Sequence, residues 1–129
     1  MPIFVLYNGS LNKIEAAMGT LSFDYDGTLS GKDVQDYAKE KKSLGYKIVI
    51  TTARNSTDDN SKLEEVAKEI GISTINYTDG ADKWKTLKNK SYKFHLDNNP
   101  DQTKLINENT NVTGITKTGN WKSKCDGAL

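Results

Sequence analysis

Residues 21–29, LSFDYDGTL, join a short apolar segment to a turn that carries two carboxylates, Asp24 and Asp26. The apolar segment predicts a buried strand over residues 21–24. In an extended chain, side chains two positions apart point the same way, so both carboxylates can face one ligand. Two like charges this close require a compensating cation, and oxygen ligands of this kind suit Mg²⁺, which also binds phosphate oxygens. Gly27 permits the sharp turn and the close backbone approach that a bound phosphate requires.

The rest of the chain alternates between strand and helix patterns. A helical spacing of apolar residues follows residues 21–24 and ends at Gly45, and a second strand–helix unit ends at Gly71. The predicted strands lie at residues 21–24, 47–51, 73–77, 92–96 and 112–115, and the later helices at residues 79–87 and 100–106. Residues 3–7 have strand propensity, and residues 11–18 fit either a helix or a strand. This alternation predicts a doubly wound, Rossmann-like α/β fold with a mostly parallel sheet and helices on both faces.

The composition fits one domain over residues 1–129. The 35% of hydrophobic residues supply one core despite a mean hydropathy of −0.69, and a net charge of +1 gives no global attraction to nucleic acid or membranes. One cysteine and one histidine exclude a disulfide framework and a structural zinc site. No apolar run approaches the roughly 20 residues of a membrane span, and no targeting segment is visible, so we expect a cytoplasmic protein without membrane contact. Residues 1–19 form an extension without an assigned role, and residues 117–129 a basic polar tail.

Ligands of a doubly wound sheet bind at the carboxyl ends of its strands, so the polar residues there are the candidate site. The second strand ends at Thr52, whose hydroxyl and neighbouring backbone N–H groups suit phosphate oxygens. Lys83, preferred over Lys85, offers an ammonium near the start of a short helix, where it could neutralise phosphate charge. The fourth strand runs into Asp97, with Asp101 four residues on, and these carboxylates complete a predicted cation site with those of the first strand end.

Each of these residues also has a purely structural interpretation. Asp and Gly are ordinary turn residues, and threonines favour strand ends. Lys83 and Lys85 belong to a lysine-rich stretch, which also suits a solvated helix face. One of the two acids at positions 97 and 101 is explained by capping of the following helix.

Taken in order, these motifs resemble those of the haloacid dehalogenase superfamily of phosphohydrolases over roughly residues 20–116. Residues 24–29, DYDGTL, match the superfamily's DxDGT[L/V] motif in full. Thr52, Lys83 and the DNNPD segment at residues 97–101 match its second, third and fourth motifs.

The resemblance implies a Mg²⁺-dependent phosphatase that hydrolyses a phosphomonoester in two steps. Asp24 would be the nucleophile that forms an aspartyl-phosphate, and Asp26 would be the general acid and then the general base toward water. Thr52 and Lys83 would orient the phosphate and neutralise its charge. The implied metal ligands are Asp24, the backbone carbonyl of Asp26, Asp97 and, directly or through water, Asp101.

Two features of this chain qualify the resemblance. Many members have a second acid directly after the first acid of the fourth motif, whereas Asn98 follows Asp97 here and leaves that role to Asp101. No cap domain is expected, because only residues 30–32 separate the first motif from the next helix and Gly71 leads directly toward a strand. The site should therefore be open, so it could admit a phosphate on a large body or be covered by another subunit.

Two alternatives to this function stay open at the level of sequence. One is a phosphatase of nucleotides or nucleic-acid ends, because the polar tail places Trp121 beside Lys122 and other cations, as single-stranded nucleic-acid surfaces do. Trp121 could equally pack on the domain. The other is a catalytically weak phosphate-binding or partner-binding module with a relaxed fourth motif at Asn98. We expect His95 to be a packed strand histidine and Cys125 an incidental surface cysteine.

Overall fold

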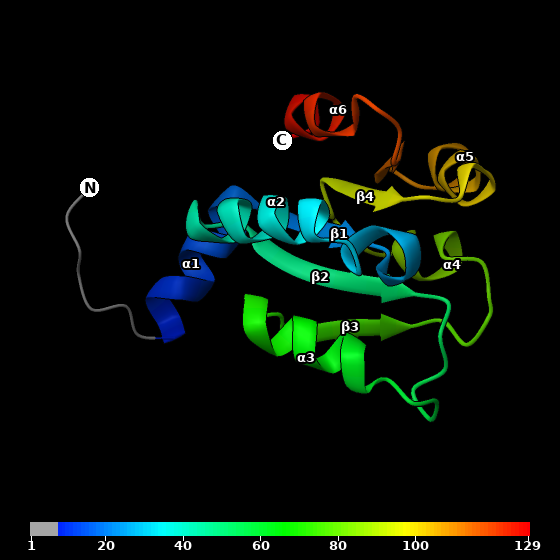
Figure 1. The fold of residues 1–129 in the computed structure, drawn as a ribbon. Coiled ribbons are helices and arrows are strands. Elements are labelled where there is room, and N and C mark those ends of the chain that lie inside the picture. The colour runs from blue at the N-terminus through cyan, green and yellow to red at the C-terminus, as the bar shows by residue number, and fades with distance from the viewer. Residues whose placement is uncertain (1–7) are drawn as a thin grey trace.

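A five-stranded sheet forms the centre of the fold, and its neighbouring strands all run parallel (Figure 1). The computed structural model describes residues 8–129. The strands are β1 (Thr20–Phe23), β2 (Lys47–Thr52), β3 (Thr74–Tyr77), β4 (Phe94–Asp97) and β5 (Thr113–Thr116). Their order in the sheet is β3-β2-β1-β4-β5, so the direction of winding reverses between β1 and β4. The predicted doubly wound α/β fold is confirmed.

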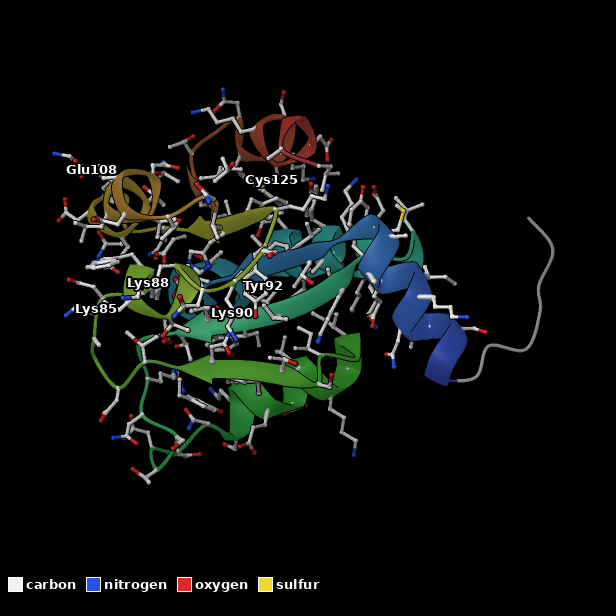
Figure 2. All side chains as sticks on the ribbon, turned by 180° about the vertical axis from the view of Figure 1, so that it is seen from behind. Lys85, Lys88, Lys90, Tyr92, Glu108 and Cys125 are labelled. Carbon is white, nitrogen blue, oxygen red and sulfur yellow. The ribbon has the colours of Figure 1, made fainter. Side chains whose placement is uncertain are left out.

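Helices cover both faces of this sheet, and the structure holds no cap domain within residues 8–129. The elements are α1 (Asn8–Met18), a tight helical turn η1 (Tyr25–Leu29), α2 (Lys32–Ser43), α3 (Ser61–Ile70), α4 (Trp84–Leu87), α5 (Pro100–Asn109) and α6 (Trp121–Gly127). Helices α2, α3 and α6 pack on one face, and α4 and α5 pack on the other (Figures 1 and 2). Only Ser30 and Gly31 separate η1 from α2, and three residues lead from α3 to β3. None of the helices described is long and apolar enough to cross a membrane.

The larger part of the core lies on the α2, α3 and α6 face. Alternation along β1 directs Leu21 and Phe23 to this face, where both side chains are fully buried. The Phe23 ring meets the edges of Phe94 and Tyr37, with centroids 5.6 and 6.4 Å apart. Each such side chain contributes about 1.5–3 kcal/mol through burial, so these contacts are a main source of stability for the sheet.

The structure also corrects element boundaries that the sequence left open or placed differently. Residues 11–18 belong to a helix, and the predicted helix at residues 79–87 is confined to α4. Asp79 and Gly80 have φ angles of 53° and 78°, in the left-handed region, so a right-handed helix cannot pass through them. The strand propensity of residues 3–7 lies outside the described residues.

The outer edge of β5 is closed by groups from its own chain. The Asn107 amide pairs with Gly114 as a neighbouring strand would, accepting from its N–H at 2.8 Å and donating to its carbonyl at 2.9 Å. The Thr110 hydroxyl contacts both backbone polar groups of Val112, and the Thr116 carbonyl accepts from the N–H of Thr118. The outward-facing backbone groups of Val112 and Gly114 are therefore satisfied without another strand.

The end of the chain is a packed helix, where the sequence suggested a polar tail. Trp121 and Cys125 are buried in the core, and the Trp121 ring lies 5.2 Å from that of Tyr37. The prediction of a surface cysteine is wrong, and burial raises the pKa of the Cys125 thiol to about 12, so it stays protonated. Trp121 takes the packing role, which removes the aromatic on which the nucleic-acid interpretation of the tail depended.

The Asp126 carboxylate of α6 binds two side chains of α2. The Tyr37 hydroxyl donates to Asp126 at 2.7 Å, and the Lys41 ammonium lies 3.3 Å from the same carboxylate. The Lys41 ammonium also lies 4.9 Å from the centre of the Tyr37 ring. These hydrogen bonds, chiefly that from Tyr37, lower the pKa of Asp126.

We predict that this carboxylate stabilises the fold near neutral pH and loses its effect in acid. Because the pKa of Asp126 in the folded state lies below its ordinary value of 3.8, the stabilisation is complete above that value and disappears as the pH falls through the folded-state pKa. Asp126→Asn should lower the unfolding free energy by about 0.5–1 kcal/mol at pH 6 and by much less at pH 2. Urea denaturation at both pH values measures this. Asp36→Asn, at an equally exposed carboxylate of α2, is the control, and an equal loss at both pH values for Asp126→Asn would contradict the assignment.

Candidate functional site

The candidate site is a cavity of about 330 Å³ at the carboxyl ends of the strands, beside the point where the winding reverses. Its lining residues are Asp24, Asp26, Ala53, Gly80, Ala81, Lys83, Asp97, Asn98, Asn99 and Gln102. A larger cavity of about 580 Å³ lies between α5, β5 and α6, and its charged lining residues, Lys104 and Lys124, are both exposed. Only the smaller of the two brings buried charged groups together, so the chemistry is assigned to it.

The end of β1 positions Asp24 through backbone contacts. The Asp24 N–H donates to the Leu96 carbonyl on β4 at 2.9 Å, and the Asp24 carbonyl accepts from Leu29 in the following turn at 3.0 Å. Gly27, with φ of 74°, allows this turn, and a Cβ there would collide with the Asn98 amide. The Thr28 hydroxyl donates to one Asp24 oxygen, Oδ2, at 3.2 Å. The DGT segment therefore holds the Asp24 carboxylate at the base of the cavity.

Lys83 joins the two buried carboxylates of the site. Its ammonium lies 2.6 Å from Asp24 Oδ1 and 2.6 Å from Asp97 Oδ2, and all three side chains are at most 7% exposed. Its backbone N–H donates to the Gln102 side chain, which fixes the segment before α4 to α5. Lys85 is exposed and has no ion-pair partner among residues 8–129. The structure thus brings Lys83, and not Lys85, to the carboxylates.

The surroundings shift the pKa values of the Asp24 and Asp97 carboxylates in opposite directions. Burial raises the pKa of Asp24, and the nearby Asp97 charge adds to this, while Lys83 opposes both. Burial also acts to raise the pKa of Asp97, but the His95 hydrogen bond and the Lys83 charge outweigh it and lower that pKa. Asp97 is therefore the fixed anion of the pair, and the charge on Asp24 depends on the cations around it.

Arg54 holds the Asp26 carboxylate at the rim of the cavity. The guanidinium donates two parallel hydrogen bonds, from Nε to Asp26 Oδ2 at 2.9 Å and from an Nη to Oδ1 at 2.8 Å. It also lies 5.1 Å from the centre of the Tyr25 ring. The hydrogen bonds from Arg54 lower the pKa of Asp26. The sequence prediction gave Arg54 no role, although its position two residues after Thr52 places it at a strand end.

The expected fourth-motif acid Asp101 is not brought to this site. It is exposed on the first turn of α5, its N–H donates to Asn99, and it does not line the cavity. Asn98 lies there instead. A terminal atom of its amide is 3.2 Å from the Asp26 carbonyl oxygen and 3.1 Å from Asp24 Oδ2. The hydrogen-bonding surroundings assign this atom as the amide nitrogen, which donates to both oxygens, and turning the amide over would bring its oxygen to the same point.

Thr52 is buried at the end of β2, but its hydroxyl contacts the backbone of the following turn and does not line the cavity. It accepts from the Arg54 N–H at 3.2 Å, and the neighbouring Ala53 lines the cavity in its place. In this geometry Thr52 supports the turn that presents Arg54.

The donor set around Asn98 fits a divalent cation such as Mg²⁺. No group of three or more His, Cys, Asp or Glu side chains in the described part of the chain is arranged to hold a metal. The groups that converge there are instead the Asp24 carboxylate, the Asp26 backbone carbonyl and the Asn98 amide, whose oxygen would face a bound ion if the amide turned over, and such oxygens are the hard donors that Mg²⁺ prefers. One ammonium between two carboxylates also leaves a negative charge in excess at the site.

We predict that the Lys83 ammonium is required for stability because its loss leaves two buried carboxylates without a cation. Lys83→Met should lower the unfolding free energy at pH 8 by about 3–5 kcal/mol, and Lys85→Met, the control, should change it by less than about 0.5 kcal/mol. Without Lys83 the folded-state pKa of a carboxylate rises above its unfolded value, so the deficit should shrink at pH 5. Chemical denaturation at the two pH values measures both effects. A deficit that stays the same, or grows, at pH 5 would contradict the charge argument.

Comparison with known proteins adds information on the fold. The chain matches no protein-family model, and no curated protein sequence matches it significantly. A solved structure from Vibrio cholerae, of a protein provisionally assigned as a 3-deoxy-D-manno-octulosonate 8-phosphate phosphatase, is similar with a TM-score of 0.53. The identity is 20%, and the match covers 93% of this chain and 88% of that one. The α/β fold described here is therefore similar, over most of the chain, to that of a solved structure.

Proposed function

We propose that this protein is a Mg²⁺-dependent phosphatase that hydrolyses a phosphomonoester through a covalent intermediate on Asp24. The observation that carries the proposal is the buried Asp24 carboxylate, which Lys83 holds at one oxygen and which lines the cavity at the strand ends. The resemblance of residues 24–29 to the haloacid dehalogenase motif supports it. So does the fold, which is shared with a protein assigned, provisionally, as a phosphatase.

The reaction follows from the position of Asp24. An oxygen of Asp24 attacks phosphorus, and the P–O bond to the alcohol breaks as the bond to Asp24 forms. Lys83 remains within hydrogen-bond distance and offsets part of the charge of the carboxylate and the phosphate. Water then attacks the phosphorus of the aspartyl-phosphate, which releases inorganic phosphate and regenerates the Asp24 carboxylate.

Asp26 is the group that we assign to proton transfer. The leaving alcohol needs a proton and the attacking water must lose one, so one carboxyl at the rim can serve both steps. Arg54 keeps Asp26 ionised, which is the form that accepts a proton from water. A substrate phosphate that draws Arg54 away would remove this ion pair and favour protonation of Asp26 before the first step.

The Mg²⁺ ion would be held by Asp24, the backbone carbonyl of Asp26 and the Asn98 amide oxygen, with Asp97 lining the same cavity. When bound, the ion supplies positive charge to the phosphate oxygens. Because Asp101 does not line the cavity, we propose Asn98 as the ligand in its place.

A second candidate is a phosphatase of nucleic-acid ends. Lys85, Lys88 and Lys90 are exposed on α4 and the loop after it, directly beyond Lys83, and have no ion-pair partner among residues 8–129 (Figure 2). A nucleic-acid chain attached to the reacting phosphate would have to extend over α4 to meet these cations. This candidate therefore rests on the lysines after α4, and no longer on Trp121.

The test is hydrolysis of p-nitrophenyl phosphate, phosphorylated metabolites and 5′- and 3′-phosphorylated oligonucleotides. We expect turnover with Mg²⁺, none with EDTA, and a loss of about 10³-fold or more in Asp24→Asn because the covalent nucleophile is removed. Asp36→Asn, on the exposed face of α2, should retain full activity. Borohydride added during turnover should reduce an aspartyl-phosphate at position 24 to homoserine, which mass spectrometry detects.

The outcomes separate the candidates. A preference for oligonucleotides that Lys88→Ala together with Lys90→Ala abolishes would support the nucleic-acid-end phosphatase. Binding of phosphate or Mg²⁺ without hydrolysis of any substrate would instead support a phosphate-binding or partner-binding module. Turnover that Asp24→Asn leaves intact would overturn the proposed mechanism.

A further inference from the structure

A row of polar side chains, all buried except the half-buried Asn76, crosses the sheet and ends on Asp97. It runs from Asn76 on β3 through Thr51 on β2 and Ser22 on β1 to His95 on β4. The side chains of Thr51, Ser22 and His95 are fully buried. Strand register explains the row, because Thr51 pairs with Asn76 and Ser22 pairs with His95, which places each pair on the same face of the sheet. The mechanism proposed above uses none of the first four residues.

Hydrogen bonds connect every neighbouring pair in the row. The Asn76 amide nitrogen donates to the Thr51 hydroxyl at 3.2 Å, and that hydroxyl lies 2.8 Å from the Ser22 hydroxyl. Ser22 Oγ lies 2.8 Å from His95 Nδ1, and His95 Nε2 lies 2.9 Å from Asp97 Oδ2. No gap in the row is long enough to require a bridging water.

The chemistry of the two ends gives these hydrogen bonds one direction. A carboxylate only accepts, so His95 Nε2 must carry a proton toward Asp97. Nδ1 of the neutral ring then accepts from Ser22, whose oxygen accepts from Thr51. The Thr51 oxygen is left to accept from an amide, which is what Asn76 provides at the other end.

We propose that this row locks His95 as its Nε2–H tautomer and makes it a positioning residue for Asp97. Asp97 Oδ2 accepts from both His95 and Lys83, while its Oδ1 accepts from the Asn99 N–H. The histidine therefore prevents rotation of the carboxylate that holds Lys83 against Asp24. The consequence for catalysis rests on the proposed function, whereas the tautomer and its dependence on Asn76 do not.

The single histidine of this chain allows a direct test, because histidine labelled with ¹⁵N gives signals from His95 alone. In the wild-type protein at pH 7 we expect a protonated Nε2 and an unprotonated Nδ1. Asn76→Asp replaces the donor at the start of the row by an acceptor of nearly the same shape, so Thr51 must turn its proton toward it. Ser22 then donates to Thr51 and accepts from His95, which requires a proton on Nδ1. The ¹⁵N signal of Nδ1 should therefore shift strongly. Asn111→Asp, the same change at an exposed position away from the row, should leave both signals in place.

Kinetics tests the positioning role. His95→Leu should lower kcat by about 10–100-fold with a small change in KM. The variant loses the hydrogen bond from His95 to Asp97, whereas the groups that contact the substrate remain. His95→Gln can place a donor at the position of Nε2 and should recover part of kcat, which a purely structural histidine would not predict. Far-UV circular dichroism checks folding. If His95→Leu does not fold, His95→Gln and the ¹⁵N spectra of Asn76→Asp decide the question.

Three results would overturn the proposal: a proton on Nδ1 in the wild-type protein, no change of the His95 signals in Asn76→Asp, or full kcat in folded His95→Leu. Failure of the proposed function looks different. In that case no phosphomonoester is hydrolysed, but the spectra still report the Nε2–H tautomer and its dependence on Asn76.

Discussion

Two carboxylates buried side by side with one ammonium between them set the main constraint on this protein. Asp24 and Asp97 end neighbouring strands, so the parallel pairing of β1 and β4 forces their side chains together. Such a pair is unstable out of water unless cations approach it closely. Lys83 meets part of this need and leaves one negative charge in excess among the three groups.

The neighbourhood of the site can be understood as a response to this constraint. Lys83 reaches the carboxylates because the turn at Asp79 and Gly80 redirects the chain after β3 and the Gln102 side chain fixes the segment before α4. The sheet itself is divided in the same way. Its α2, α3 and α6 face carries the aromatic core, while its α4 and α5 face carries hydroxyl, amide and imidazole groups. Among residues 8–129, no buried side-chain polar atom lacks a hydrogen-bond partner, so the polar face is stable because it is fully paired.

Much of this arrangement could be predicted from sequence, because strand ends are marked by simple signals. Apolar runs that stop at Asp24, Thr52 and Asp97 locate the carboxyl edge, and the alternation of strands and helices gives the fold. What could not be predicted depends on side-chain direction. Whether position 98 or 101 faces the cavity depends on where α5 begins, which the Asn99 cap decides. α6 is only seven residues long, and the spacing of Trp121 and Cys125 is too short a pattern to separate a packed helix from a polar tail.

The closed edge of β5 has a consequence for how the molecule meets other copies of itself. An edge strand with unpaired backbone groups can pair with an extended segment of another chain and so promote aggregation. On β5, the Asn107 amide already forms both hydrogen bonds that Gly114 would offer to such a strand. A strand from another copy would have to displace this amide before it could pair with β5 at Gly114, so this edge is a poor template for association between copies.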